Sequence, residues 1–144
     1  MHLRAISVSL LLSLAPGTLP AAGPNLRITG TNIQSDDGSF IVWVYENADT
    51  WLSDRWRTQK VIKVSGNRKD DAISVELSLP PGEYALSVFQ DVNDDGKLER
   101  NFIGLPKEPA GLSNNLRPKF GPPRFKDAKF TVGETLVEQR IELR

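Results

Sequence analysis

The stretch Gln90–Phe102, QDVNDDGKLERNF, holds the residues whose types and spacing point most directly to chemistry. Its acidic and amide side chains recur at alternate positions. This spacing lets the oxygen ligands of a twelve-residue calcium loop converge on one ion, while a glycine at the sixth position makes the sharp turn. Counted from Asp91, Gly96 falls at that sixth position. The predicted calcium ligands are Asp91, Asn93, Asp95, Lys97 through its carbonyl oxygen, and Glu99.

The calcium pattern is incomplete at its end. The twelfth position is Phe102, where such loops have a bidentate Glu. Closing the shell would need Glu108, or the side chains of Asn114 and Asn115, from the segment that follows. Without them, the same residues form a solvated polar turn with Gly96 in the left-handed region. The sequence leaves both interpretations open.

The residue types that are missing narrow the chemistry further. The chain has no Cys, and its one His is His2, inside an N-terminal segment that we expect to be removed. The mature protein would therefore lack Ser-His-Asp and Cys-His nucleophile systems and the usual zinc and copper ligands. An enzyme would have to be a carboxylate-dependent hydrolase of envelope or extracellular glycans, using acids such as Asp91, Asp95 or Glu99. No pair of carboxylates is marked out, so a non-catalytic protein is the favoured interpretation.

The N-terminus has the layout of a secretory signal peptide. Arg4 precedes an apolar run from Ala5 to Leu14, and Pro16 and Pro20 follow it. The apolar run is about half of the roughly 20 residues that span a bilayer as a helix, so we expect no permanent membrane anchor.

We therefore predict a signal peptide over residues 1–22 and a periplasmic or secreted location. The remaining residues, 23–144, are enough for one domain with its own core and too few for two. The 18 basic and 18 acidic residues of the chain balance, which gives no attraction to nucleic acid.

Alternating apolar residues predict most of the secondary structure. Residues 72–79 and 83–89 each read as a half-buried strand, and Pro81-Gly82 between them suits a tight turn, so the two strands are predicted to form a hairpin. The residues expected to face inward are Ile73, Val75, Leu77, Tyr84, Leu86 and Val88.

Short strands at close spacing continue through the chain. The other strands are predicted at residues 25–33, 40–46, 60–64, 128–132 and 135–143. Asp37-Gly38 between the first two is a hairpin signal. The pattern predicts an all-β fold, an antiparallel β-sandwich of about seven strands that is immunoglobulin-like or transthyretin-like.

Two segments lack strand alternation. Residues 47–56, NADTWLSDRW, place Leu52 and Trp56 on one face and predict a short helix. Residues 102–125 contain five Pro and three Gly, which predicts one long ordered loop. The apolar side chains expected to pack back onto the sandwich are Phe102, Ile103, Leu105, Leu112, Phe120 and Phe125.

Aromatic and basic groups each allow a binding role and a structural one. The aromatic side chains of residues 43–56 could stack on sugars, but core packing is favoured because aromatics dominate burial in small cores. They are Trp43, Tyr45, Trp51 and Trp56. Five cations could bind an anionic polymer, although nearby acids favour a solvated surface. They are Arg117, Lys119, Arg124, Lys126 and Lys129.

The order of the motifs resembles that of a known family. LPPGEYALSVFQDVNDDGKLERNFIGLPKE is followed by GLSNN and then by FGPPRFKDAKFTV. In this order the chain resembles a family of small exported bacterial proteins described as domain of unknown function 2141 (DUF2141). The resemblance implies a β-sandwich, an envelope or secreted location and no established activity. LPPGEYALSV also resembles the hairpin of transthyretin-like and carboxypeptidase-regulatory-like sandwich modules.

These observations combine into one functional hypothesis. The protein is expected to be an exported, non-catalytic β-sandwich module of the cell envelope. Residues 91–101 and 102–125 would form one surface, organised by calcium, that binds an envelope or extracellular component. The residues expected to contact that partner are Asn101, Ser113, Asn114, Asn115 and Arg117.

Overall fold

The computed structural model describes Gly17 and residues 23–144, so the predicted signal peptide, apart from Gly17, lies outside the described residues. The described part forms eight strands and two short helical turns. The strands are β1 Leu26–Thr31, β2 Ser39–Tyr45, β3 Thr58–Lys63, β4 Ile73–Leu77, β5 Gly82–Asp91, β6 Ala110–Leu112, β7 Phe130–Val132 and β8 Val137–Glu142. The turns are the 3-10 helix η1 Ser113–Asn115 and the α-helix α1 Phe125–Ala128.

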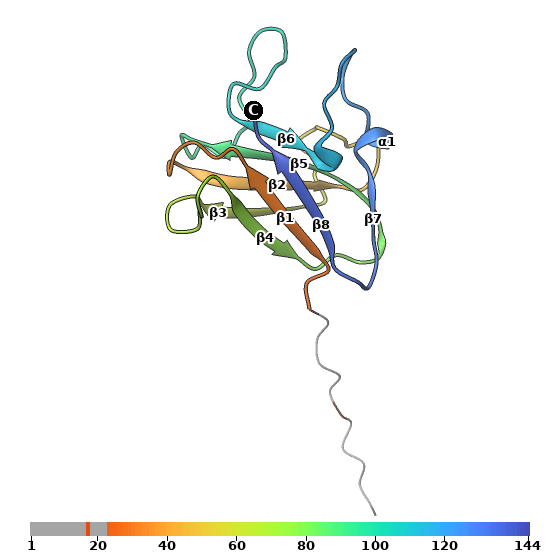
Figure 1. Ribbon diagram of the computed structural model, residues 1–144. Coiled ribbons are helices and arrows are strands. Elements are labelled where there is room, and N and C mark those ends of the chain that lie inside the picture. The colour runs from red at the N-terminus through yellow and green to blue at the C-terminus, as the bar shows by residue number, and fades with distance from the viewer. Residues whose placement is uncertain (1–16, 18–22) are drawn as a thin grey trace, which may run out of the picture.

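The strands form two sheets that pack against each other (Figure 1). One sheet has the order β4-β1-β8, and the other has the order β3-β2-β5-β6, with β7 also paired to β5. Every pairing is antiparallel except that of β1 with β8, which run parallel. The predicted all-β sandwich is therefore confirmed. The strand that the pattern did not indicate is β6, which lies inside the predicted long loop.

The main core fills the space between the two sheets. It joins Leu26 and Ile28 of β1 to Val42 of β2, all fully buried, and to inward residues of the other long strands. Five residues predicted to face inward are buried here, namely Ile73, Val75, Tyr84, Leu86 and Val88. The sixth, Leu77, is partly buried and packs against them. Within the described residues, neither helical segment has the length and apolar character required to cross a membrane.

The two strands of each predicted hairpin, β1 with β2 and β4 with β5, lie in opposite sheets, so both predicted hairpins are wrong. β4 pairs with β1 in one sheet, while β5 pairs with β2 in the other. The turn at Asp37-Gly38 likewise carries the chain from β1 to β2 across the sandwich. The physical reason is that both sheets bury their inward faces in the same core. The alternation of apolar and polar residues is therefore the same in two cases: when a strand pairs with the strand before it, and when the chain crosses to the facing sheet.

The outer face of the larger sheet is also covered, which the alternation did not predict. β2 is buried at every position, and β5 is buried from Tyr84 to Asp91. The cover is a second cluster, in which Trp43 stacks on Trp56 with ring centroids 4.8 Å apart. Tyr45 meets Trp51 edge to face at 5.2 Å. The interpretation of these aromatics as core residues is confirmed.

Residues 47–56 form turns instead of the predicted helix. The Asn47 Oδ1 accepts the backbone N–H of Thr50 at 3.1 Å, and Leu52 has a φ of 58°, in the left-handed region that an α-helix excludes. These turns bring Trp51 and Trp56 onto the outer cluster. Burial of the two indole rings therefore outweighs the weak local preference for a helix.

Candidate functional site

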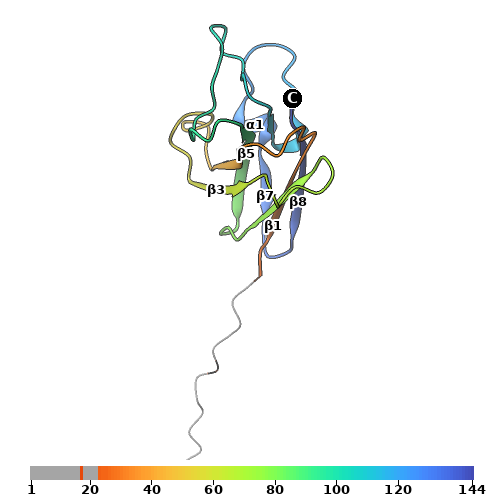
Figure 2. The same ribbon diagram turned by 90° about the vertical axis from the view of Figure 1, so that its left-hand side faces the viewer.

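Two loops project from the same end of the sandwich, as Figures 1 and 2 show from two directions. The first runs from Asp91, where β5 ends, to Ala110, where β6 begins. The second runs from Leu116 to Arg124, between η1 and α1. Together they occupy most of the segment that the sequence predicted to be one long loop. The intervening β6 pairs with β5 and divides that segment in two.

The outgoing and returning halves of the first loop lie side by side and are joined by backbone hydrogen bonds. At its base, the Gln90 N–H donates to the Pro109 carbonyl at 2.9 Å. Further out, the Lys107 N–H donates to the Glu99 carbonyl at 2.8 Å. These hydrogen bonds continue the β5/β6 pairing beyond the sheet, so the returning half of the loop lies beside the predicted calcium loop.

The predicted calcium loop is wrapped around the carboxylate of Asp91. This side chain is 1% exposed, and its Oδ1 and Oδ2 accept the N–H groups of Asp95 at 3.2 Å and Gly96 at 2.7 Å. Gly96 has a φ of 73°, as the predicted sharp turn requires. The Asp95 Oδ1 accepts the Lys97 N–H at 2.9 Å, and the Asn93 amide donates to the Glu99 Oε1 at 3.2 Å. Hydrogen bonds within one turn thus involve the side chains of four predicted ligands, Asp91, Asn93, Asp95 and Glu99.

Glu108 is the further acidic residue that the fold brings to this loop. It is 9% exposed, and its Oε1 accepts the Val92 N–H at 3.2 Å. Its Oε2 is buried with no hydrogen-bond partner, which is costly for a carboxylate oxygen. Burial raises the pKa of Glu108, and the negative charge of Asp91 raises that pKa further. The sequence predicted that either Glu108, or Asn114 and Asn115, would complete the calcium coordination shell. In the structure, Asn114 and Asn115 bond to β8 instead.

Asp94 belongs to the same stretch but faces the sandwich. Its Oδ1 accepts the Ser39 hydroxyl at 2.6 Å, and its Oδ2 binds the Lys63 ammonium at 2.5 Å. The hydrogen bond from Lys63 lowers the pKa of Asp94. Asp94 therefore anchors the loop to β2 and β3. In the described part of the chain, no three acidic, His or Cys side chains are arranged closely enough to form a metal site by themselves.

The Ser113-Asn114-Asn115 run forms hydrogen bonds that stabilise the fold. Ser113 is fully buried, which corrects the prediction that it contacts a partner. Its hydroxyl accepts the Leu86 N–H at 2.9 Å and donates to the Ala128 carbonyl at 2.6 Å. The Asn114 N–H donates to the Gln139 Oε1 at 2.8 Å. Because Gln139 lies on β8 and Leu86 on β5, this run ties the two sheets together.

The side chains of the other two Asn residues in the predicted partner set also bond to backbone groups. The Asn115 Oδ1 accepts the Glu142 N–H of β8 at 3.0 Å. The Asn101 Oδ1 caps the tip of the first loop by accepting the N–H groups of Ile103 at 3.1 Å and Leu105 at 2.9 Å. Of the five predicted contact residues, Arg117 is the one that lines the cleft described next.

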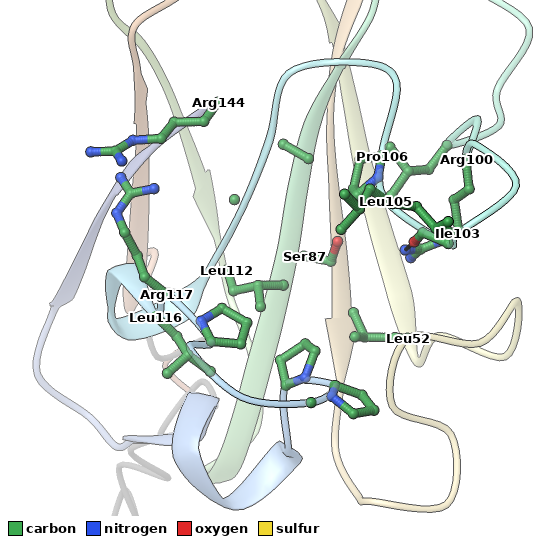
Figure 3. A pocket seen from close by; sticks show the side chains of 18 of the residues that line it. Leu52, Ser87, Arg100, Ile103, Leu105, Pro106, Leu112, Leu116, Arg117 and Arg144 are labelled. Atoms are coloured by element: carbon green, nitrogen blue, oxygen red, sulfur yellow. Dashed lines mark hydrogen bonds between the residues drawn. The ribbon is translucent and has the colours of Figure 1, made fainter.

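A cleft of about 900 Å³ lies between the two loops. Figure 3 shows Ser87 and Leu112 on its floor, Arg100, Ile103 and Leu105 on one wall, and Arg117 and Arg144 on the other. Its surface is mostly apolar, and besides the prolines of both loops the large apolar lining residues are Leu52, Leu98, Ile103, Leu105, Leu112 and Leu116. Leu98 and Arg100 come from the first loop, so the predicted calcium loop leads directly into the cleft wall.

The charged groups of the cleft are three arginines and one carboxylate. Glu142 is the one acidic residue among the described residues that line it. Its oxygens pair with Arg117 at 3.1 Å and Arg144 at 3.3 Å, and the hydrogen bond from Arg144 lowers the pKa of Glu142. Arg100, on the opposite wall, donates to the Gly104 carbonyl at 3.0 Å. Among the described residues that line it, the cleft therefore carries more positive than negative charge, and its arginines favour the ionised form of Glu142.

A family model described as "Uncharacterized protein conserved in bacteria (DUF2141)" matches residues 28–140. The chain belongs to the DUF2141 family. The DUF2141 match runs from β1 to β8 and therefore includes the calcium-like loop, the buried Ser113 run and both loops that border the cleft. No curated protein and no solved structure matches the chain. The looser likeness to transthyretin-like and carboxypeptidase-regulatory-like modules stays a prediction.

The buried position of Ser113 gives a direct test of the inter-sheet tie. Ser113→Ala leaves the buried Leu86 N–H without an acceptor, so we expect the free energy of unfolding to fall by about 1 to 3 kcal/mol. Ser78 is exposed, and Ser78→Ala should change it by less than about 0.5 kcal/mol. Urea denaturation measures both values. Equal, small effects at the two serines would show that the tie contributes nothing to the fold.

Proposed function

We propose that this DUF2141 protein is an exported, non-catalytic β-sandwich module of the cell envelope that binds an envelope or extracellular component between its two loops. The observation that carries the proposal is the cleft of about 900 Å³, whose volume lies in the range typical of ligand sites. Its walls come from loops, which carry binding functions more often than the scaffold that supports them. The scaffold itself is held by two buried clusters.

The lining of the cleft indicates the chemistry of the ligand. Leucines and prolines supply apolar contact over most of the surface. Arg100 on one wall and Arg117 on the other supply guanidinium groups, which recognise carboxylate and phosphate oxygens with several hydrogen bonds. A ligand with an apolar body and an anionic group fits both features.

The geometry favours binding over the alternative of a glycan hydrolase. Such an enzyme needs two carboxyl groups across an open cleft, one of them protonated to act as an acid. Glu142 stands alone among the described lining residues and is kept ionised by its two arginines. Asp91, one of the acids considered for that role, is 1% exposed and has both oxygens engaged by backbone N–H groups.

We also propose that calcium organises the first loop. The groups that would hold it are Asp91, Asn93, Asp95, the Lys97 carbonyl, Glu99 and Glu108. The unpartnered Oε2 of Glu108 supports this assignment, because a cation at this position would balance the charges of Glu108 and of the neighbouring buried carboxylate of Asp91. Glu108 supplies the carboxylate that is missing at Phe102. Calcium would supply only charge balance and cross-linking here, since it fixes the start of the loop to its end.

Export is tested by the N-terminus of the protein found in its host. We expect the protein outside the cytoplasm, with its first residue between Ala21 and Asn25, because a signal peptide is removed during translocation. N-terminal sequencing of the purified protein measures this. Recovery of a soluble cytoplasmic chain that starts at Met1 would contradict export.

Calcium binding is tested by thermal unfolding and titration calorimetry. At about a hundredfold excess over its dissociation constant, calcium should add about 2.7 kcal/mol to the free energy of unfolding and raise the melting temperature. Magnesium should do much less, since it requires octahedral geometry and loses its waters reluctantly. Glu108→Gln should abolish the calcium effect, and without calcium it should raise the melting temperature because it removes a buried, unbalanced charge.

Asp94→Asn provides the matched control for calcium. Asp94 lies in the same loop but is engaged by Ser39 and Lys63, so this variant should keep the calcium effect. An unchanged melting temperature and a flat calorimetric trace for the wild type in millimolar calcium would show that the loop is a polar turn.

Ligand binding in the cleft is tested with a fluorescent anionic amphiphile, dansylaminoundecanoic acid, below its micelle concentration. We expect saturable enhancement of dansyl emission, and about tenfold weaker binding after Arg100→Gln or Arg117→Gln, because each substitution removes a charge-assisted hydrogen bond. The exposed Lys60 lies on β3 outside the cleft, and Lys60→Gln should bind as the wild type does. No saturable binding, or equal binding by all variants, would refute the cleft as the ligand site.

A further inference from the structure

The two loops of the cleft end in fully exposed aromatic side chains. Phe102 is 100% exposed and Phe120 is 95% exposed, so neither stabilises the fold by packing. Ile103 and Leu105 beside Phe102 are 64% and 56% exposed. With Val92 at the start of the first loop, five of the seven large hydrophobic side chains that are exposed in the described part of the chain thus lie on these two loops. The exposure of Phe102, Ile103, Leu105 and Phe120 corrects the prediction that these four pack back onto the sandwich.

The exposed tips have defined backbone conformations. At the first tip, Asn101 accepts the N–H groups of Ile103 and Leu105, and Gly104 adopts a φ of 85°. At the second, Gly121 follows Phe120 with a φ of 71°. The prolines next to Gly121 leave few backbone conformations. The loops therefore present their phenyl rings outward on ordered supports.

Each tip is flanked by cations and free of acids. Residues 100–107, RNFIGLPK, contain Arg100 and Lys107, and residues 116–124, LRPKFGPPR, contain three further cations and no Asp or Glu. Within the described residues, Lys107 and Lys119 form no ion pair. The whole chain has equal numbers of acidic and basic residues, and the acids of the first loop lie outside residues 100–107, so this positive charge is local to the two tips.

The two tips can meet one surface at the same time. Figures 1 and 2 show both loops rising at one end of the sandwich, opposite the end at which β1 begins. A flat surface that approaches this end of the sandwich would meet both loops, which carry the exposed Phe102 and Phe120.

We propose that the two loop tips dock this protein on an anionic lipid membrane, with Phe102 and Phe120 inserted at the boundary between headgroups and acyl chains. The inference rests on the export and loop surface of the proposed function and names lipid as the envelope component. Apolar insertion and attraction to anionic lipid act together in such interfacial binding. Arg100, Lys107 and Lys119 lie at the depth of the lipid phosphates.

The combination of features favours a lipid surface over other partners. A soluble polyanion would be bound by the cations alone and would leave the two phenyl rings in water. A protein partner would require a contiguous apolar patch, whereas the rings here stand on two separate loops on either side of a cleft. A membrane accommodates separate apolar tips and balances the surrounding positive charge.

Sedimentation with vesicles tests the proposal. The protein should bind vesicles of equal parts phosphatidylglycerol and phosphatidylcholine, should bind pure phosphatidylcholine at least tenfold more weakly, and should be released by high salt. Phe102→Ser and Phe120→Ser should each weaken binding about tenfold, since each removes one buried phenyl ring. Val61 is an exposed apolar residue on β3, and Val61→Ser should leave vesicle binding unchanged.

The cleft probe separates this inference from the proposed function. Phe102 and Phe120 do not line the cleft, so both variants should bind dansylaminoundecanoic acid as the wild type does. Intact probe binding without vesicle binding would overturn the membrane inference alone. Polyphosphate binding that is as tight as vesicle binding and insensitive to both Phe substitutions would overturn it in favour of an anionic polymer. A dimer dispersed by Phe102→Ser would overturn it in favour of a second copy of the chain.

Discussion

The structure depends most on the burial of β5 on both of its faces. Leu86 and Val88 fill the core between the sheets, while Phe89 on the other face packs into the aromatic cluster under Trp43. One long edge of β5 pairs with β2, and the opposite edge is shared by β6 and β7. Where β6 ends, the Ser113 hydroxyl takes over as acceptor for the Leu86 N–H. The chain has no cysteine to form a disulfide, and β5 is the strand that pairs with three others.

The two loops that border the cleft are anchored to β5. The first loop leaves β5 at the buried Asp91 and returns to pair with it at β6, and the second begins directly after the Ser113 run. The Trp51 indole donates to the Pro123 carbonyl at 3.0 Å and so fastens the second loop to the aromatic cluster. The tips extend beyond these anchors, and their exposed phenyl rings contribute nothing to the core. A stable base with apolar tips is the arrangement expected of a surface that contacts something else.

Glu108 shows most clearly that part of this surface is not explained by folding alone. A buried carboxylate with an unpartnered oxygen next to Asp91 opposes folding, and an amide of the same shape would avoid that cost. Natural sequences keep such groups chiefly where they bind or react. Calcium would convert the repulsion between the two carboxylates into a cross-link at the base of the first loop. Leu98 and Arg100, which line the cleft, lie on that loop, so the proposed calcium ligands and the cleft are connected by a short stretch of chain.

The sequence by itself determined which residues face inward on β4 and β5, the glycine turn at Gly96 and the role of the aromatics as core. These follow from local periodicity, backbone sterics and side-chain size. Tertiary structure alone decided which sheet each strand joins, the parallel pairing of β1 with β8, and the burial of Ser113. It also decided which candidate residue approaches the acidic loop, which is Glu108 and not Asn114 or Asn115. The alternation of apolar and polar residues indicates that a side chain is buried but not which strands bury it. Both sheets share one core, and the pairing of strands depends on contacts between residues far apart in the chain.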